Sequence, residues 1–170
     1  MRDGFLKVAA ASPQMRVADC AYNTEQMEKA IAAAAQRGVS LLVLPELCLT
    51  SYSCEDLFWQ PALLEAAQEG VLRLAQATKD REIVVAAGLP LTVNGRLYNA
   101  AAVLANGRIL GVVPKRHLPN YTEFYEGRHF APGPREVTSV ELGGAAVPFG
   151  TRQLFRCSEL PAFVLGVQIY

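Results

Sequence analysis

Apolar and polar residues along the first half of the chain fall into blocks that predict strands and helices in alternation. Residues 6–12, 39–44 and 83–87 are short, mainly apolar runs that predict buried strands, and 39–44 is apolar on both faces, as is typical of a strand in a covered sheet. Between the first two runs, residues 23–26 offer a helix cap for an alanine-rich helix over 27–37 that stops at Gly38. A second helix is predicted to begin at Pro61 and to end near residue 79.

The second half has a different pattern, in which pairs of tight-turn residues separate apolar runs. Asn94-Gly95 and Asn106-Gly107 each predict a β-hairpin, so we expect antiparallel strands there. A long polar loop follows over residues 116–136, and the apolar segment 163–170 reads as a further buried strand. Together these elements predict an α/β fold in which a mixed sheet carries helices on one face.

Composition limits the classes of function to consider. The chain has 170 residues, 51% of them apolar, which suits a single globular domain. Sixteen basic and sixteen acidic residues give zero net charge without long runs of either sign, so nucleic acid is not an expected partner. We find neither a signal segment nor a span long enough to cross a membrane, and we therefore expect a cytoplasmic protein.

Two charged residues follow apolar strands directly and are candidates for chemistry. Glu46 comes after Pro45 at the end of one predicted strand, and Lys115 comes after Pro114 at the end of another. Open α/β folds place their sites at strand ends, where a glutamate can take a proton and a lysine can stabilise an oxyanion. We therefore expect Glu46 and Lys115 to point into one pocket at the ends of neighbouring strands. Taken singly, each residue is also explained as a turn or cap residue that faces water.

The histidines and cysteines give weaker indications of function than Glu46 and Lys115. Four cysteines, at 20, 48, 54 and 157, lack metal-ligand or disulfide spacing and are expected to be reduced. Cys48 and Cys54 are near Glu46 in sequence, but each is explained as a small buried side chain. His117 and His129 have no partner at metal-ligand spacing, so no metal is expected.

Four segments of the chain resemble the amino-terminal glutaminase region of glutamine-dependent NAD synthetases, which belong to the nitrilase superfamily. The likeness extends over essentially the whole chain, and the stretch around Tyr121 and Phe124 separates these synthetases from other nitrilases. The segments are residues 45–58, 107–115, 118–126 and 147–150.

The resemblance implies a nitrilase-like αββα sandwich, of which residues 1–170 would be the amino-terminal part. It implies that Glu46 is a general base, that Lys115 stabilises the tetrahedral intermediate, and that Glu123 is a second carboxylate supporting the lysine. Tyr121 would line the glutamine pocket. No cofactor is implied for this region, since ATP and Mg²⁺ would act in a carboxy-terminal synthetase domain. The implied partners are glutamine, that synthetase domain and further copies of the chain in a homo-oligomer.

The chain departs from the family at the nucleophile. The family has a motif of the form Gly-Val-Glu-Ile-Cys-Glu-Asp, and the matching residues here run from Gly166 to Tyr170, so that Tyr170 stands where the cysteine is expected. A phenol with a pKa near 10 is a poor nucleophile at neutral pH. We therefore expect this chain to be inactive alone. A shortened nitrilase-type amidase and a non-catalytic binding or assembly module are the alternatives.

Overall fold

The computed structural model describes residues 5–170 and contains a seven-stranded mixed sheet with the strand order β1-β2-β3-β4-β5-β7-β6. β1, β2 and β3 are parallel neighbours, β3–β4 and β4–β5 are antiparallel, β5 and β7 are parallel, and β6–β7 is antiparallel. The predicted mixed sheet is therefore confirmed. The strands are β1 (Val8–Ala10), β2 (Leu41–Val43), β3 (Val84–Val93), β4 (Arg96–Ala105), β5 (Arg108–Pro114), β6 (Thr138–Leu142) and β7 (Ala145–Phe149).

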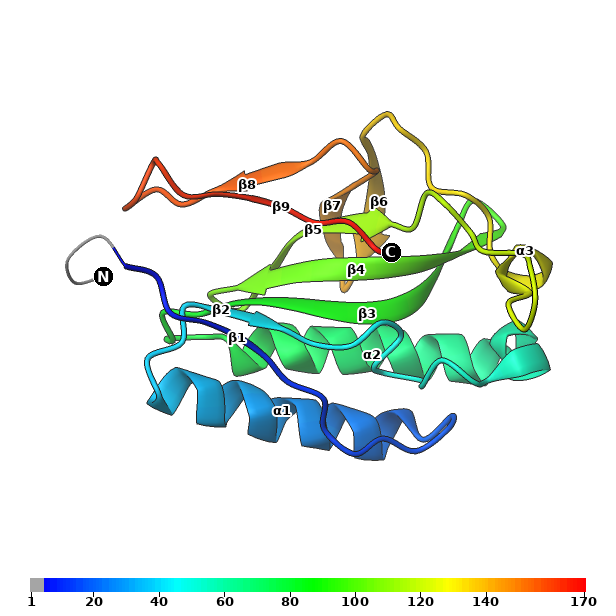
Figure 1. Cartoon of the computed structure of the whole chain (residues 1–170), viewed down its shortest axis with the longest axis horizontal. Coiled ribbons are helices and arrows are strands. Elements are labelled where there is room, and N and C mark those ends of the chain that lie inside the picture. Colours follow the sequence, from blue (N-terminus) through cyan, green and yellow to red (C-terminus); the bar gives the residue numbers. More distant parts are fainter. Residues whose placement is uncertain (1–4) are drawn as a thin grey trace.

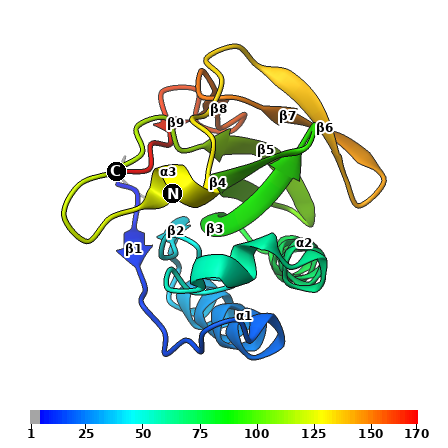
Figure 2. The ribbon, with the colours of Figure 1, turned by 90° about the vertical axis from the view of Figure 1, so that its right-hand side faces the viewer.

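Two long helices cover one face of this sheet, as the sequence predicts (Figures 1 and 2). They are α1 (Cys20–Gln36) and α2 (Pro61–Ala77), and both turn apolar side chains such as Ile31 and Leu74 into the core, where these are fully buried. Burying such side chains is the main favourable contribution to folding.

The start of α1 differs from the prediction. Asp19 is the N-cap, and its carboxylate accepts a hydrogen bond from the backbone N–H of Tyr22. Asn23, expected in the cap, lies inside the helix and is fully buried, and its amide donates to the carbonyls of Arg16 and Leu49. Its polar side chain serves a tertiary contact, which a local capping pattern does not reveal.

Both predicted hairpins are present. The turn residues Asn94 and Gly95, and likewise Asn106 and Gly107, all have positive φ between 49° and 75°, the backbone conformation of a two-residue turn between antiparallel strands. The parallel pairing of β5 with β7 was not expected, because the sequence predicted only antiparallel strands after residue 87. The residues between these strands contain the short helix α3 (Glu126–His129), whereas the 3-10 helix η1 (Glu55–Trp59) lies earlier, between β2 and α2.

The end of the chain is not the buried core strand that its apolar sequence predicts. β8 (Leu154–Arg156) and β9 (Val164–Gly166) pair as a separate antiparallel ribbon on the sheet face opposite the helices (Figures 1 and 2). Their side chains alternate between exposed and half-buried, and Leu154 is 76% exposed. Within residues 5–170 no helix is both long and apolar enough to span a membrane.

Candidate active site

Glu46 is held by a tight approach of its own turn to the sheet. The chain leaves β2, passes Pro45, and turns at Leu47, which has a φ of +50°. Gly88 on β3 lies directly beneath: a Cβ atom there would collide with backbone atoms of Pro45, Glu46 and Leu47. The missing side chain of Gly88 therefore lets the turn rest on the sheet and fixes where the Glu46 carboxylate points.

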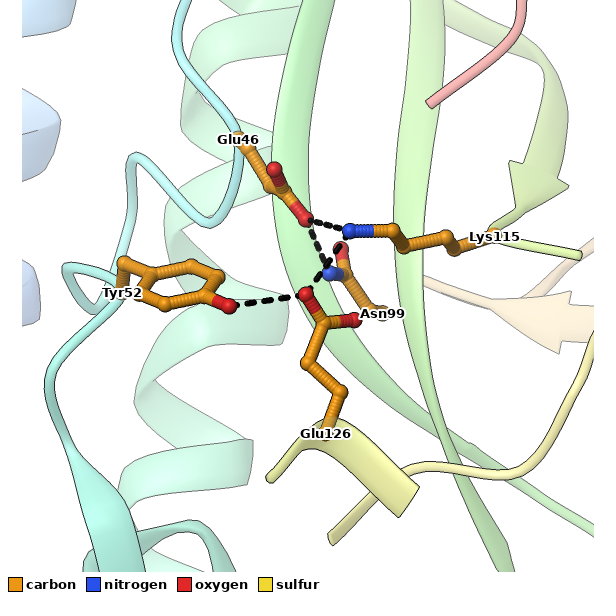
Figure 3. A network of polar contacts seen from close by, with 5 residues as sticks. All are labelled: Glu46, Tyr52, Asn99, Lys115 and Glu126. Carbon is orange, nitrogen blue, oxygen red and sulfur yellow. Dashed lines mark hydrogen bonds and ion pairs between the residues drawn. The ribbon is translucent and has the colours of Figure 1, made fainter. Parts of the chain in front are cut away.

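Lys115 lies just past the end of β5 and is buried between two carboxylates. Its backbone N–H donates to the carbonyl of Asn99 on β4, over 2.7 Å. Its side chain is only 2% exposed, and Nζ donates to Oε1 of Glu46 and to Oε1 of Glu126, both over 2.8 Å (Figure 3). An ammonium buried this deeply requires such partners, because an unpaired charge in the interior is costly.

Two further donors bind the same carboxylate oxygens that accept from Lys115. Nδ2 of Asn99 donates to Oε1 of Glu46, and the hydroxyl of Tyr52 donates to Oε1 of Glu126 over 2.8 Å (Figure 3). Burial, and then the hydrogen bond to Glu126, raise the pKa of Tyr52 well above its ordinary value. Tyr52 is therefore a neutral phenol at physiological pH and remains a hydrogen-bond donor.

The structure changes two details of the sequence prediction. Glu46 and Lys115 were expected at the ends of neighbouring strands, but they follow β2 and β5, with β3 and β4 between them. The two side chains nevertheless meet beside Asn99, which lies within β4 and donates to the Glu46 carboxylate (Figure 3).

The carboxylate beside the lysine is Glu126 rather than the expected Glu123. Within residues 5–170 the ion pairs of Lys115 are with Glu46 and Glu126. Glu123 is exposed, and a hydrogen bond from the Thr122 hydroxyl lowers its pKa. Glu126 is the first residue of α3 and is 5% exposed, so that the short helix turns its side chain inward.

The cluster lies at the base of a cleft of about 590 Å³. Tyr121 and Phe124 line it with their rings in an edge-on arrangement, 5.9 Å between centroids, and Tyr170 lines it from the end of the chain. Glu46 is 31% exposed on its side chain, far more than Lys115 or Glu126, so its carboxylate is the one most accessible from this cleft. The site thus combines an accessible carboxylate, a buried ammonium and an aromatic wall.

The cysteines of the described chain lie away from the cleft lining. Cys48 is fully buried, donates to the carbonyl of Gly88, and has a pKa raised to about 12 by burial. Burial also raises the pKa of Cys54. Neither thiol is ionised at neutral pH, and both are the small packing residues that the sequence suggested. Residues 5–170 contain no group of three or more side chains arranged to hold a metal ion.

Comparison with known proteins agrees with this fold. The family model described as "Carbon-nitrogen hydrolase" matches residues 7–169. The chain belongs to the carbon-nitrogen hydrolase family.

Particular relatives within that family are the glutamine-dependent NAD(+) synthetases. The synthetase of Mycobacterium tuberculosis is 43% identical over 98% of this chain, and that of Aquifex aeolicus is 34% identical over 85% of it. The chain spans about a quarter of the length of these relatives, 24% and 25% respectively.

Solved structures of a synthetase and of an amidase are also similar to this chain. The crystal structure of a glutamine-dependent NAD(+) synthetase from Cytophaga hutchinsonii superposes with a TM-score of 0.84 at 32% identity, over 91% of this chain and 26% of that one. An amidase from Nesterenkonia sp. shares the fold, with a TM-score of 0.67 at 24% identity, over 87% of this chain and 56% of that one.

Proposed function

We propose that this chain is the glutaminase portion of a glutamine-dependent NAD synthetase, the part that releases ammonia from glutamine. The observation that carries the proposal is the Lys115 ammonium, buried between Glu46 and Glu126 at the base of an aromatic-walled cleft. The ammonia would serve the amidation of deamido-NAD to NAD in an ATP- and Mg²⁺-dependent synthetase domain. We propose no cofactor for the glutaminase region itself, a cytoplasmic location, and assembly into a homo-oligomer.

In the proposed mechanism a thiol at position 170 gives its proton to Glu46 and attacks the side-chain carbonyl carbon of glutamine. Lys115 stabilises the negative oxygen of the tetrahedral intermediate. The intermediate expels ammonia, which carries away the proton from Glu46, and leaves a glutamyl thioester for water to hydrolyse. Glu126 holds the lysine, and Tyr121 lines the pocket for the glutamine side chain.

Tyr170 bears on whether the 170-residue chain is catalytically active. Its phenol lacks the reactivity of a thiolate at neutral pH, so we propose that the 170-residue chain does not turn glutamine over. The same observation favours a second candidate, a non-catalytic module that uses the cleft for binding or assembly. A nitrilase-type amidase is the alternative within enzymes.

A chimera separates the glutaminase from the non-catalytic module. Residues 1–169 are joined to the remainder of the Mycobacterium tuberculosis synthetase, with either cysteine or tyrosine at position 170. We expect ammonia release from glutamine with cysteine and a rate roughly 10³-fold lower with tyrosine, because removing a nucleophile costs orders of magnitude. In the cysteine form Lys115→Ala should abolish release, whereas Lys79→Ala, at an exposed lysine outside the cleft, should not.

The module candidate predicts a different result. There, the cysteine chimera would fold and bind glutamine but release no more ammonia than the tyrosine form. That outcome would contradict the proposed glutaminase function.

A further inference from the structure

A second pocket, of about 210 Å³, lies beside the cleft and has a basic lining. Arg116, Arg135, Arg152 and His117 all line it, over a floor that includes Val113 and Pro114. His117, Gln168 and Ile169 line both this pocket and the cleft, so the two are neighbours. We refer to it below as the arginine pocket.

The positive charge of the arginine pocket is not neutralised by the protein. No aspartate or glutamate of residues 5–170 is among its lining residues, and none of its three arginines forms an ion pair within that range. Elsewhere in the molecule Arg73 and Arg128 are paired with Glu28 and Asp56. Because the chain as a whole has zero net charge, this local excess does not follow from composition.

Backbone hydrogen bonds fix the three arginine-bearing loops against one another. Gly133 N–H donates to the carbonyl of Lys115, and Thr151 N–H donates to the carbonyl of Pro134, over 2.8 and 3.0 Å. Each bonded residue lies within two positions of an arginine of the pocket. Nη1 of Arg116 also donates to the carbonyl of Gly133 over 2.8 Å. Like charges held together by the fold repel each other, and an anion placed among them would relieve that repulsion.

We propose that the arginine pocket binds a small oxyanion, either a phosphate group or a carboxylate. Guanidinium groups match both anions because their planar N–H donors can form paired hydrogen bonds to two oxygens. The volume is below the roughly 300–1,000 Å³ of pockets for drug-sized molecules, which favours one anionic group over a large ligand. The inference goes beyond the proposed function, since it assigns an anion site next to the glutamine cleft and does not require catalysis.

The test is a calorimetric titration of the 170-residue chain with inorganic phosphate at constant ionic strength. We expect saturable binding that Arg135→Gln combined with Arg152→Gln weakens at least tenfold. The matched control combines Arg96→Gln with Arg156→Gln, which removes the same charge at exposed arginines outside this pocket and should leave the affinity within about twofold. All four side chains are exposed, so both double variants should fold, which circular dichroism checks.

A second titration with L-glutamate identifies the source of the anion. If glutamate competes with phosphate and is weakened by the same pocket variant, the site takes carboxylates. If phosphate binds and glutamate does not compete, the site takes phosphate groups. Unsaturable binding, or equal weakening in the pocket and control variants, would mean that only general electrostatic attraction is present and would overturn the proposal. A protein that releases no ammonia can still pass this test, so its outcome is separate from that of the proposed function.

Discussion

At the scale of single residues, the site is organised around one buried ammonium. Glu46 and Glu126 each use one oxygen, Oε1, to accept from Lys115 and from a second donor, Asn99 or Tyr52. Both carboxylates line the cleft, but Oε2 of Glu126 is buried without a partner in the described chain, whereas the Glu46 side chain is 31% exposed. This asymmetry supports a proton-accepting role for Glu46 and a positioning role for Glu126.

The first prediction separates Glu126 from Glu123. In the cysteine chimera, Glu126→Gln should reduce the rate of ammonia release about 100-fold, because a misplaced lysine stabilises the oxyanion poorly. Glu123→Gln, three residues away at an exposed carboxylate, should change that rate less than about twofold. Steady-state assays of ammonia release measure both variants. An equal loss in the two would contradict the assignment of Glu126.

Part of the site could be predicted from the sequence because it follows strand ends. Glu46 and Lys115 come directly after apolar runs, and the end of such a run indicates where a strand ends. Glu123 and Glu126 lie in one polar loop, and only the fold of that loop, where Glu126 N–H donates to the carbonyl of Pro119, decides which of them turns inward. Asn99 could also have been identified as a candidate site residue, because it is a polar side chain inside an otherwise apolar strand.

At the scale of elements, the fit between β3 and the turn after β2 determines where Glu46 lies. A Cβ atom at residue 88 would overlap with backbone atoms of the turn, so a methyl group at this position can be accommodated only if Glu46 moves. Flexible side chains could give way to a methyl group, but the backbone atoms of this turn cannot do so at low cost.

The second prediction compares two glycine substitutions by urea unfolding. Gly88→Ala should reduce the free energy of unfolding by about 3 kcal/mol or more, as expected for overpacking against backbone. Gly95→Ala, at a turn with a φ of +73° and open space around the new methyl group, should cost only about 1 kcal/mol. A Gly88→Ala protein as stable as Gly95→Ala would show that the turn adjusts freely.

The elements also show which parts of the fold are determined by a few neighbouring residues. Asn-Gly pairs determine both hairpins through backbone conformation alone, so they could be predicted without knowledge of the rest of the chain. The cap of α1 could not be predicted in this way, because the Asn23 amide donates its hydrogen bonds to the carbonyls of residues 16 and 49. The pairing of β5 with β7 likewise depends on a connection of thirty residues, 115–144, for which no short pattern exists.

At the scale of the whole molecule, buried acidic protons link stability to pH. Burial raises the pKa of Cys48 to about 12 and that of Cys20 to about 11, from 9.0 for both, and it also raises the pKa of Tyr52. Because the pKa values of the two thiols are higher in the folded state, the contribution of each thiol is fully present below its ordinary pKa of 9.0 and is lost as the pH rises to about 11 for Cys20 and about 12 for Cys48.

The third prediction follows from that sign. The free energy of unfolding should fall between pH 8 and pH 10, with Cys48 alone contributing about 1 kcal/mol of the fall. Cys48→Ala should make the fall smaller by that amount, whatever its effect at pH 8. Urea unfolding at the two pH values measures this. A fall of unchanged size in Cys48→Ala would contradict the assignment of the raised pKa to this thiol.

The sheet face opposite the helices bears on the predicted homo-oligomer. Val8 and Val43 lie on neighbouring strands and are 60% and 45% exposed, although both are apolar. Exposed apolar surface favours association. The fourth prediction is that the chain self-associates in sedimentation velocity experiments and that Val8→Ser combined with Val43→Ser shifts it toward the monomer. A chain that is monomeric at all concentrations would contradict it.

The central claim is that Glu46, Lys115 and position 170 form one glutamine-processing site, and covalent trapping tests it most directly. The cysteine chimera is treated with 6-diazo-5-oxo-L-norleucine, an electrophilic analogue of glutamine, and labelling at residue 170 is followed by mass spectrometry. We predict rapid labelling, slowed at least 100-fold by Glu46→Gln and unaffected by Glu25→Gln, at an exposed glutamate of α1. Labelling at position 170 that is equally fast in the Glu46→Gln variant would contradict the account.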